Sequence, residues 1–276
     1  MPKIIWLASY PKSGNTWMRA FLANYLLGQE EPVAIEDLRA FSLSDVRPRF
    51  YAEVLSKPVQ EMTAEESVSL RPQAQRCLAA ARDHDHFVKT HSMFGMLNEV
   101  PLIDRSVSAG AVYIIRNPAD IVPSYASHMG VGPDAAIKMM GDREHATVEV
   151  DVQILTHLGR WGEHVESWMD RSQSLPVCLV RYEDLYDDPE KAFGQVLKVL
   201  GLPFEPERLK RSIRHSSFEE LSRQENQNGF SERPPHMKRF FRSGGSGEGA
   251  RALNAQQLDR LVRDHGSVMK RFGYLP

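Results

Sequence analysis

The sequence predicts an α/β fold, a single domain with a central parallel sheet flanked by helices. Three observations favour this class. Short apolar runs alternate with segments of helical spacing, and this alternation implies right-handed crossovers between parallel strands. The run 111–115 is apolar throughout, as a strand buried on both faces is. The length of 276 residues suits one large domain covering 1–276.

The expected strands and helices follow from the spacing of apolar residues and from the capping residues, glycines and prolines at their ends. Apolar runs predict four strands, at 4–8, 86–90, 111–115 and 176–180. Helical spacing, caps and glycine stops predict helices from Trp17 to a stop at Gly28 and over 118–129, 148–169, 189–200, 205–213, 218–223 and 254–271. Prolines break residues 30–83 into short helices, one of which begins with a capping box at Thr63. Residues 224–251 are polar, basic and glycine-rich, which is typical of a loop.

The composition excludes several other classes of protein. Hydrophobic residues make up 42% and charged residues 25%, which is ordinary for a globular protein and unlike a disordered or fibrous one. A net charge of −2 gives no general attraction to nucleic acid or anionic membranes, so any anion site is local. Two cysteines are too few for a disulfide framework and indicate a reducing compartment. No signal peptide or membrane span is visible, so we expect a cytoplasmic protein without a nucleic-acid partner.

The turn between the first strand and the first helix has the character of a phosphate cradle. A glycine-containing turn at this place directs several backbone N–H groups at one point, at the positive end of the helix dipole. Its residues are Lys12, Ser13, Gly14, Asn15 and Thr16. The turn is not a Walker A motif, because the spaced first glycine and the Gly-Lys-Ser/Thr ending are missing. The alternative is an ordinary turn in which Asn15 or Thr16 only caps the helix.

Several polar side chains directly follow predicted strands. They are Lys12, Lys89, His91 and Arg116. In parallel sheets, ligands bind beyond the carboxyl ends of the strands. We therefore expect these four side chains to gather at one edge of the sheet.

Five motifs, in order along most of the chain, resemble those of cytosolic-type sulfotransferases. They are Tyr10 to Trp17; Lys89-Thr90-His91; Arg116-Asn117-Pro118 with Ser124 eight residues after the arginine; Arg181 to Leu185; and Ser216-Ser217-Phe218. A sixth segment, Phe241 to Gly247, resembles the C-terminal cofactor loop of that family more loosely. There Ser243, Gly249 and Ala250 replace the lysine and the Trp-Lys pair that are usual. The resemblance implies a P-loop NTPase-like sulfotransferase fold.

The resemblance also implies the cofactor, 3′-phosphoadenosine 5′-phosphosulfate (PAPS). PAPS carries anionic groups at both ends of its adenosine, so its binding needs two separate sites. The cradle with Lys12 would hold the phosphosulfate, and Arg116 would hold the 3′-phosphate, because its planar fork suits phosphate oxygens. Ser124, Arg242 and Gly244 would complete that second site. Trp17 would stack on adenine, and Tyr182, Ser216 and Phe218 would finish the base pocket.

Each assignment has a structural alternative. Arg116 could be a surface ion-pair partner, and Ser124 a plain helix serine. The aromatic residues Trp17, Tyr182 and Phe218 could be core side chains. The basic run from Arg233 to Arg242 could be a solvated loop rather than a flexible cover over the ligand. Histidines and aspartates alternate over 83–86, but no metal motif accompanies them, so we expect no metal.

As a mechanism, we expect in-line sulfuryl transfer to an acceptor hydroxyl or amine, which leaves adenosine 3′,5′-bisphosphate (PAP). His91 is the expected general base, since an imidazole titrates near neutrality. Lys12 would neutralise charge on the leaving phosphate, and Lys89 would support the sulfuryl group or position the nucleophile.

The acceptor is expected to be small, hydroxylated and partly apolar. Residues 30–83 and 127–160 lie outside the motifs and are the expected walls of its pocket, and 224–251 is the expected cofactor-covering loop. Methionines and a phenylalanine over 93–96, and methionines at 129, 139 and 140, would form an adaptable apolar lining, although core packing explains them equally well. The divergent C-terminal loop shows no recognisable dimer motif.

Two rival classes share parts of this pattern. A nucleotide kinase would share the cradle but needs a Walker lysine and an acidic magnesium ligand, and the sequence shows no convincing set. A non-catalytic nucleotide-binding or interaction protein would keep both anion sites without a base, and His91 argues against it.

Overall fold

The structure is a computed structural model that describes residues 1–149, 153–170 and 174–275. The chain forms two compact units. Unit 1 contains residues 1–10, 42–113 and 139–179, and unit 2 contains 11–41, 114–138 and 180–276. The chain leaves unit 1 for unit 2 directly after the first strand and again near the ends of two later strands. The single domain expected from the sequence stays a prediction.

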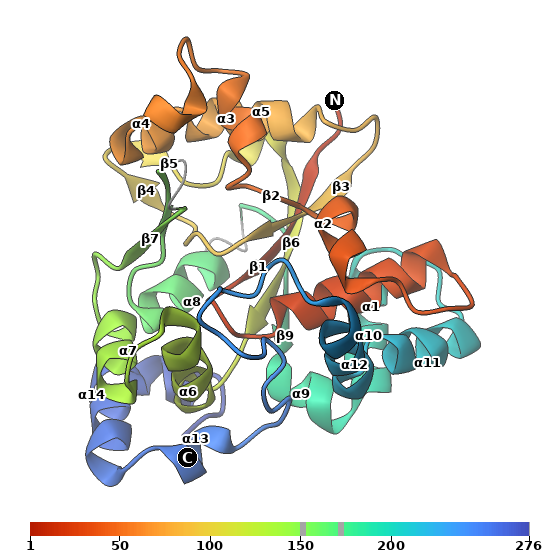
Figure 1. The fold of residues 1–276 in the computed structure, drawn as a ribbon, viewed down its shortest axis with the longest axis vertical. Coiled ribbons are helices and arrows are strands. Elements are labelled where there is room, and N and C mark those ends of the chain that lie inside the picture. The colour runs from red at the N-terminus through yellow and green to blue at the C-terminus, as the bar shows by residue number, and fades with distance from the viewer. Residues whose placement is uncertain (150–152, 171–173, 276) are drawn as a thin grey trace. The chain divides into compact units, whose positions relative to one another are not determined.

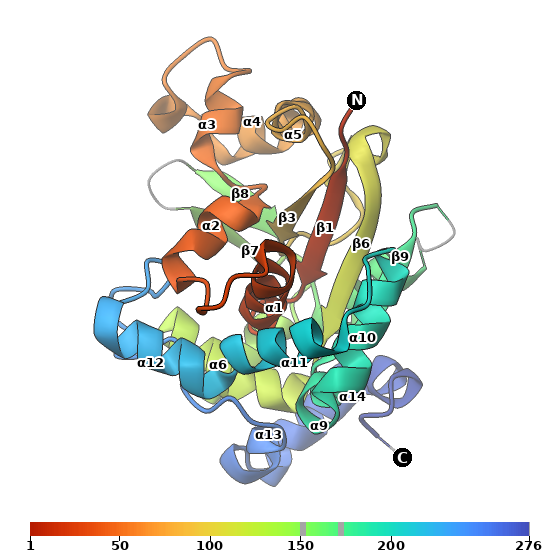
Figure 2. The same ribbon diagram turned by 90° about the vertical axis from the view of Figure 1, so that its right-hand side faces the viewer.

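A parallel sheet of five strands, in the order β2-β3-β1-β6-β9, confirms the predicted fold class. The neighbouring strands β3, β1 and β6 can be followed in Figure 2. The register between β1 and β3 pairs Ile4 with His86 and continues to Ala8 and Thr90. Because of this register, the residues that directly follow the two strands are also neighbours.

Unit 1 holds most of the sheet, two small hairpins and several short helices. Its elements are β1 (Ile4–Ser9), β2 (Leu43–Ser44), α3 (Pro48–Ala52), η2 (Val59–Glu61), α4 (Ala64–Ser69), α5 (Arg71–Ala79), β3 (His86–Thr90), β4 (Met96–Leu97), β5 (Val100–Pro101), η3 (Arg105–Val107), β6 (Ser108–Ile115), β7 (Ala146–Glu149), β8 (Ile154–His157), α8 (Trp161–Met169) and β9 (Val177–Arg181). The last residues of β6 and β9 belong to unit 2. The strand β2 was not predicted, because two residues are too few to show periodicity.

The helix predicted over 148–169 is wrong in its first half. Strands β7 and β8 form an antiparallel hairpin there, with Ala146 opposite His157, and the helix α8 begins only at Trp161. Residues 150–152 of the predicted helix lie outside the described residues. The β-branched residues Val148, Ile154 and Thr156 favour strands, and Gly159, at a φ of 60°, separates the hairpin from the helix.

Unit 2 is mainly helical (Figure 1). Its elements are α1 (Asn15–Leu27), η1 (Ile35–Asp37), α2 (Leu38–Phe41), α6 (Pro118–Met129), α7 (Pro133–Met140, whose last two residues belong to unit 1), α9 (Tyr182–Asp187), α10 (Pro189–Val199), α11 (Pro206–His215), α12 (Phe218–Asn228), α13 (Glu248–Ala252) and α14 (Ala255–Arg271). Helix α6 has the predicted bounds, and its N-cap Asn117 accepts a hydrogen bond from the N–H of Ala119 at 3.0 Å. Gly28 ends α1 in a left-handed conformation, as predicted.

The core of unit 2 surrounds helix α1. Phe21 of α1 stacks on Phe193 of α10, with ring centroids 3.9 Å apart. A second apolar cluster joins α1 to α12 and to the segment that follows it; its members are Ala20, Ala23, Val33, Ile35, Leu38, Leu221 and Phe230, with Phe41, Phe240 and Phe241 packed against them. This packing fixes the direction in which α1 leaves the cradle.

No helix in the described part of the chain is both long enough and apolar enough to cross a membrane.

The capping box at Thr63 provides a first test of the local structure. The Thr63 hydroxyl accepts the N–H of Glu66 at 3.1 Å, and the Glu66 carboxylate accepts the N–H of Thr63 at 2.8 Å. Thr63→Ala should lower the free energy of unfolding by about 1 kcal/mol, because one helix N–H loses its acceptor. Urea unfolding measures this change. Thr63→Ser keeps the acceptor and should stay near wild type; equal losses in both variants would contradict the capping role.

Candidate functional site

The turn after β1 adopts the strained backbone of an anion cradle. Lys12 has a φ of 68° and Gly14 a φ of 104°, so two residues of this short turn are left-handed. For a lysine this conformation costs on the order of 1–3 kcal/mol, and such strain is concentrated at functional sites. Successive N–H groups of such a turn form a concave donor surface at the start of α1.

Gly14 is required because an aromatic ring lies against the turn. A Cβ at position 14 would stand 2.7 Å from Cδ2 of Tyr182, the first residue of α9. Trp17 meets the same ring edge-on, with centroids 5.5 Å apart, and also contacts Phe193. The structure therefore brings three predicted cofactor residues together: Gly14, Trp17 and Tyr182.

Two polar atoms of the cradle are buried without an acceptor. The Ser13 hydroxyl is fully buried, and within residues 1–149, 153–170 and 174–275 neither its oxygen nor the indole nitrogen of Trp17 has a hydrogen-bond partner. An unsatisfied buried polar atom costs about 1–3 kcal/mol. Oxygen atoms of a bound phosphate would remove this cost, so the turn fits an anionic ligand.

Arg116, which directly follows β6, joins the cradle to the C-terminal segment. Its guanidinium donates to the carbonyl of Lys12 at 3.1 Å and to the carbonyl of Gly245 at 2.8 Å, and lies 4.0 Å from the Tyr182 ring centroid. The side chain is buried, and no carboxylate of the described residues forms an ion pair with it. A buried cation among carbonyl oxygens fits an anion as its missing counter-charge.

The C-terminal segment, residues 229–247, is tied to the rest of unit 2 by a buried acid and a half-buried acid that could not be predicted from the sequence. The carboxylate of Glu225 accepts the N–H groups of Phe240 and Phe241 at 2.7 and 3.0 Å. Glu232 pairs with the buried Arg19 of α1 at 2.8 Å. These contacts place the Phe240 ring 3.7 Å from the ammonium of Lys12. An acid in a polar helix gives no sequence signal for such a tether.

The departures from the family pattern near the C-terminal segment have a structural reason. Helix α13 packs on α6, where Asp120 accepts the N–H groups of Gly247 and Gly249, both at 2.7 Å (Figure 1). A Cβ at position 249 would stand 2.3 Å from the backbone of Ala119. Glycine is therefore needed at 249, where the family usually has a large side chain.

The remaining predicted cofactor residues differ in their surroundings. Phe218, at the start of α12, lies against Gly244, where a Cβ would stand 2.2 Å from the ring. Arg242 forms an ion pair with Glu248. The Ser216 hydroxyl, at the C-cap of α11, is buried and donates to the carbonyl of Ser212 at 2.8 Å. Ser124 lies on α6, half-buried. Asn15 and Thr16 open α1.

Basic side chains of the C-terminal segment line an open hollow of about 580 Å³. The lining residues are Ser127, His236, Met237, Lys238, Arg239 and Arg242. His236 contacts the carbonyl of Ser127 at 3.2 Å, which ties the segment to α6. The positive charge of this hollow suits an anion rather than an apolar group.

Lys89 and His91 belong to unit 1. Lys89 lies in β3, opposite Leu7 of β1. Nδ1 of His91 lies 2.8 Å from the carbonyl oxygen of Ser9, at the end of β1, and 3.3 Å from the Ser9 hydroxyl, which can accept as well as donate. A carbonyl only accepts, so Nδ1 carries the proton, and in the neutral ring Nε2 is the basic nitrogen.

A second buried histidine supports the backbone at His91. Nε2 of His164 donates to the His91 carbonyl at 3.0 Å, and its Nδ1 accepts from the Tyr113 hydroxyl at 2.8 Å. Burial lowers the pKa of His164 to about 4, so the ring is neutral at pH 7. Sequence analysis missed His164, because a lone histidine in an apolar helix carries no signal.

Among the described residues, the predicted cofactor residues all belong to unit 2, and Lys89 and His91 belong to unit 1. In that same part of the chain, no group of three or more His, Cys, Asp or Glu side chains is arranged to hold a metal ion.

The parallel sheet with its flanking helices defines an α/β protein, and the strained strand-to-helix turn and the buried arginine fit an anionic ligand. The sulfotransferase domain family matches residues 2–273, so the chain belongs to that family and is a sulfotransferase.

Curated relatives match along nearly the whole chain. Sulfotransferase 1A1 of Canis lupus familiaris is 25% identical over 279 residues, which cover 99% of this chain and 85% of the relative. Flavonol 3-sulfotransferase of Flaveria bidentis is 24% identical over 272 residues, which cover 94% of this chain and 80% of the relative.

Solved structures share the fold. Retinol dehydratase in a complex with retinol and PAP superposes with a TM-score of 0.66 at 18% identity, covering 98% of this chain and 82% of that one. Mouse sulfotransferase SULT7A1 complexed with PAP gives 0.60 at 19% identity, with coverage of 97% and 84%. The fold predicted from the sequence is confirmed.

The buried His164 should make stability depend on pH. The unfolded chain binds a proton at this histidine near pH 6.5, whereas the folded chain binds it only near 4. Above pH 6.5 this histidine is neutral in both states and does not change the free energy of unfolding. As the pH falls from 6.5 to 4, only the unfolded chain takes up the proton, and the free energy of unfolding decreases by about 3 kcal/mol. His164→Gln keeps a donor for the His91 carbonyl but does not titrate. Urea unfolding between pH 4 and 7 should show a weaker pH dependence for the variant; equal slopes would contradict this pKa.

Proposed function

We propose that this chain transfers the sulfuryl group of PAPS to a hydroxyl or amine of a small, partly apolar acceptor and releases PAP. The observation that carries the proposal is Arg116, a buried cation joined to the cradle and to the C-terminal segment, with no carboxylate partner among the described residues. In this proposal Arg116 and the cradle supply the two anion sites that PAPS requires. The solved relatives retinol dehydratase and mouse SULT7A1 contain PAP.

In this proposal the cradle binds the phosphosulfate end of PAPS. The Ser13 hydroxyl, which has no hydrogen-bond partner within the described residues, would donate to it, and Lys12 would stabilise charge on the leaving phosphate. The ammonium of Lys12 lies 3.7 Å from the Phe240 ring centroid, a cation–π contact that holds it beside the C-terminal segment.

The guanidinium of Arg116 would bind the 3′-phosphate, with Ser124 and Arg242. Its Nε, buried and unpartnered within the described residues, remains as a donor after the two carbonyl bonds. Tyr182 and Phe218 lie against Gly14 and Gly244 and would border the adenine together with Trp17. Arg242 would leave its ion pair with Glu248 and bind the 3′-phosphate instead.

His91 is the proposed general base. The Ser9 carbonyl selects the tautomer with a basic Nε2, and Ser9 precedes Lys12 by only three residues in the chain. Nε2 would take the acceptor proton as the new S–O or S–N bond forms, an effect worth on the order of 10²–10⁴ in rate. Lys89, in the strand that ends just before His91, would position the nucleophile or support the sulfuryl group.

For the acceptor we propose a small molecule with a hydroxyl on an apolar frame. Retinol dehydratase has been crystallised with retinol and with androsterone, and the plant relative is named for a flavonol. Phe94 packs on Trp168 and Met140 is fully buried, so core packing explains these two members of the expected lining. Met93, Met96, Met129 and Met139 remain as candidates.

Nucleotide binding tests the two-site proposal by calorimetry. Arg116→Lys should raise the Kd for PAP about 10- to 100-fold, because the planar fork and its charge-assisted bonds are lost. Arg223→Lys, on an exposed arginine paired within its own helix, is the matched control and should bind normally. Tighter binding of ATP than of PAP would contradict the sulfotransferase site and favour the kinase.

Turnover tests the base. His91→Ala should lower kcat by about 10²- to 10⁴-fold in an acceptor screen with labelled PAPS, while the Kd for PAP stays near wild type. His84→Ala, which removes an exposed histidine, is the control. Near wild-type turnover by His91→Ala would refute the assignment, and absence of transfer to any acceptor by the wild type would favour a non-catalytic binding protein.

A further inference from the structure

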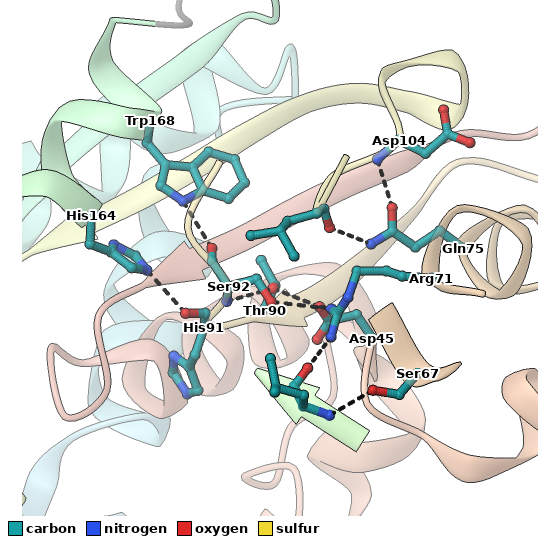
Figure 3. A network of polar contacts seen from close by, with 12 residues as sticks. Asp45, Ser67, Arg71, Gln75, Thr90, His91, Ser92, Asp104, His164 and Trp168 are labelled. Atoms are coloured by element: carbon teal, nitrogen blue, oxygen red, sulfur yellow. Dashed lines mark hydrogen bonds and ion pairs between the residues drawn. The ribbon is translucent and has the colours of Figure 1, made fainter. Parts of the chain in front are cut away.

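We propose that four buried side chains, Asp45, Arg71, His164 and Trp168, act as positioning residues for His91. They hold the three residues Thr90, His91 and Ser92 from two sides, and we name them the 90–92 clamp (Figure 3). The inference rests on the proposed role of His91 as base, and it adds residues that lie outside the matched motifs.

One side of the clamp holds backbone carbonyls. His164 donates its Nε2 hydrogen to the carbonyl of His91 at 3.0 Å, and Trp168, one turn later in α8, donates its indole hydrogen to the carbonyl of Ser92 at 3.2 Å. The Tyr113 hydroxyl fixes the His164 tautomer by donating to Nδ1 at 2.8 Å. Each of these rings is fully buried, so their positions are set by packing.

The other side of the clamp holds side-chain hydroxyls. Asp45 accepts the Thr90 hydroxyl at 2.8 Å, and Arg71 donates to the Ser92 hydroxyl at 3.2 Å. Asp45 and Arg71 pair at 3.1 Å, both buried, and Arg71 also donates to the carbonyl of Leu155 in β8. The Thr90 oxygen in turn accepts the N–H of Ser92 at 3.1 Å.

The clamp leaves the backbone around His91 little freedom. Beyond the clamp, the N–H of Met93 donates to the carbonyl of His157 at 3.0 Å, and the N–H of Phe94 to the hydroxyl of Ser167 at 3.0 Å. The imidazole itself has a fixed target, the Ser9 carbonyl at 2.8 Å from Nδ1. A backbone shift at His91 would lengthen this bond and weaken the preference for the tautomer with a basic Nε2.

Stability alone does not account for these polar groups. Replacing a buried ion pair by apolar side chains of similar volume is often neutral or stabilising, so a gain in stability is a weak explanation for the pair Asp45 and Arg71. What a hydrogen-bonded network fixes is geometry, and a displacement of about 1 Å at a reacting group costs about 10²-fold in rate.

The test compares three histidine variants. His164→Phe removes the donor to the His91 carbonyl, and His164→Gln restores a donor at a similar position. His86→Phe is the matched control, because His86 is also buried in unit 1 and bonded to carbonyls, but does not touch residues 90–92. Two readouts are used: turnover of 2-naphthol with PAPS, and the ¹⁵N shifts of selectively labelled histidines, which report the tautomer of His91 without any acceptor.

We expect His164→Phe to lower kcat about 10- to 100-fold, to leave KM for PAPS within about twofold, and to reduce the Nδ1–H population of His91. His164→Gln should recover most of both signals, and His86→Phe should change neither. A folded His164→Phe with a wild-type tautomer, or equal losses in His164→Phe and His86→Phe, would overturn the clamp.

If His164→Phe does not fold, Tyr113→Phe replaces it, because this variant removes only the hydroxyl that fixes the His164 tautomer. The same two readouts then decide the question. Failure of the proposed function is distinguishable: in that case His91→Ala leaves turnover unchanged, or the wild type shows none, while the NMR signal still reports whether the clamp orients the ring.

Discussion

The site in unit 2 depends on one buried charge, the guanidinium of Arg116. It is held by oxygen atoms from two segments distant in sequence, the turn at Lys12 and the loop at Gly245, and by the face of Tyr182. Carbonyl dipoles orient a cation but do not neutralise it. The charge that holds the two segments together therefore also favours the anionic ligand that we propose for this site.

Candidate site residues were easiest to recognise in the sequence where a polar residue comes after a predicted strand. Lys12, His91 and Arg116 became candidates because a polar residue after an apolar run has few structural explanations. The predicted strands 4–8 and 86–90 do pair in parallel, in the register Ile4–His86 to Ala8–Thr90. Helix α6 could be predicted to its ends, because Asn117, Pro118 and Gly130 mark its boundaries in local chemistry.

What escaped prediction depends on distant partners. The apolar residues between positions 148 and 157 fit the periodicity of a helix as well as that of a strand. The pairing of β7 with β8 is what favours the hairpin. Glu225, Asp120 and His164 lie in helices that read as ordinary, and their roles come from N–H and carbonyl groups of segments far along the chain. Nearly every residue carries a backbone N–H and a C=O group, so the sequence does not indicate which segment supplies a backbone partner.

The contact between His91 and the end of β1 has a consequence for mutational scanning. Nδ1 lies 2.8 Å from the main-chain oxygen of Ser9 and 3.3 Å from the Ser9 hydroxyl, and every amino acid supplies the nearer, main-chain oxygen. Replacing the side chain at position 9 therefore leaves the proposed tautomer selector in place, and a scan that ranks residues by their effect on activity would undervalue this position. Only a change to the peptide unit itself, such as an ester substitution between residues 9 and 10 that weakens the carbonyl as an acceptor, would reveal it.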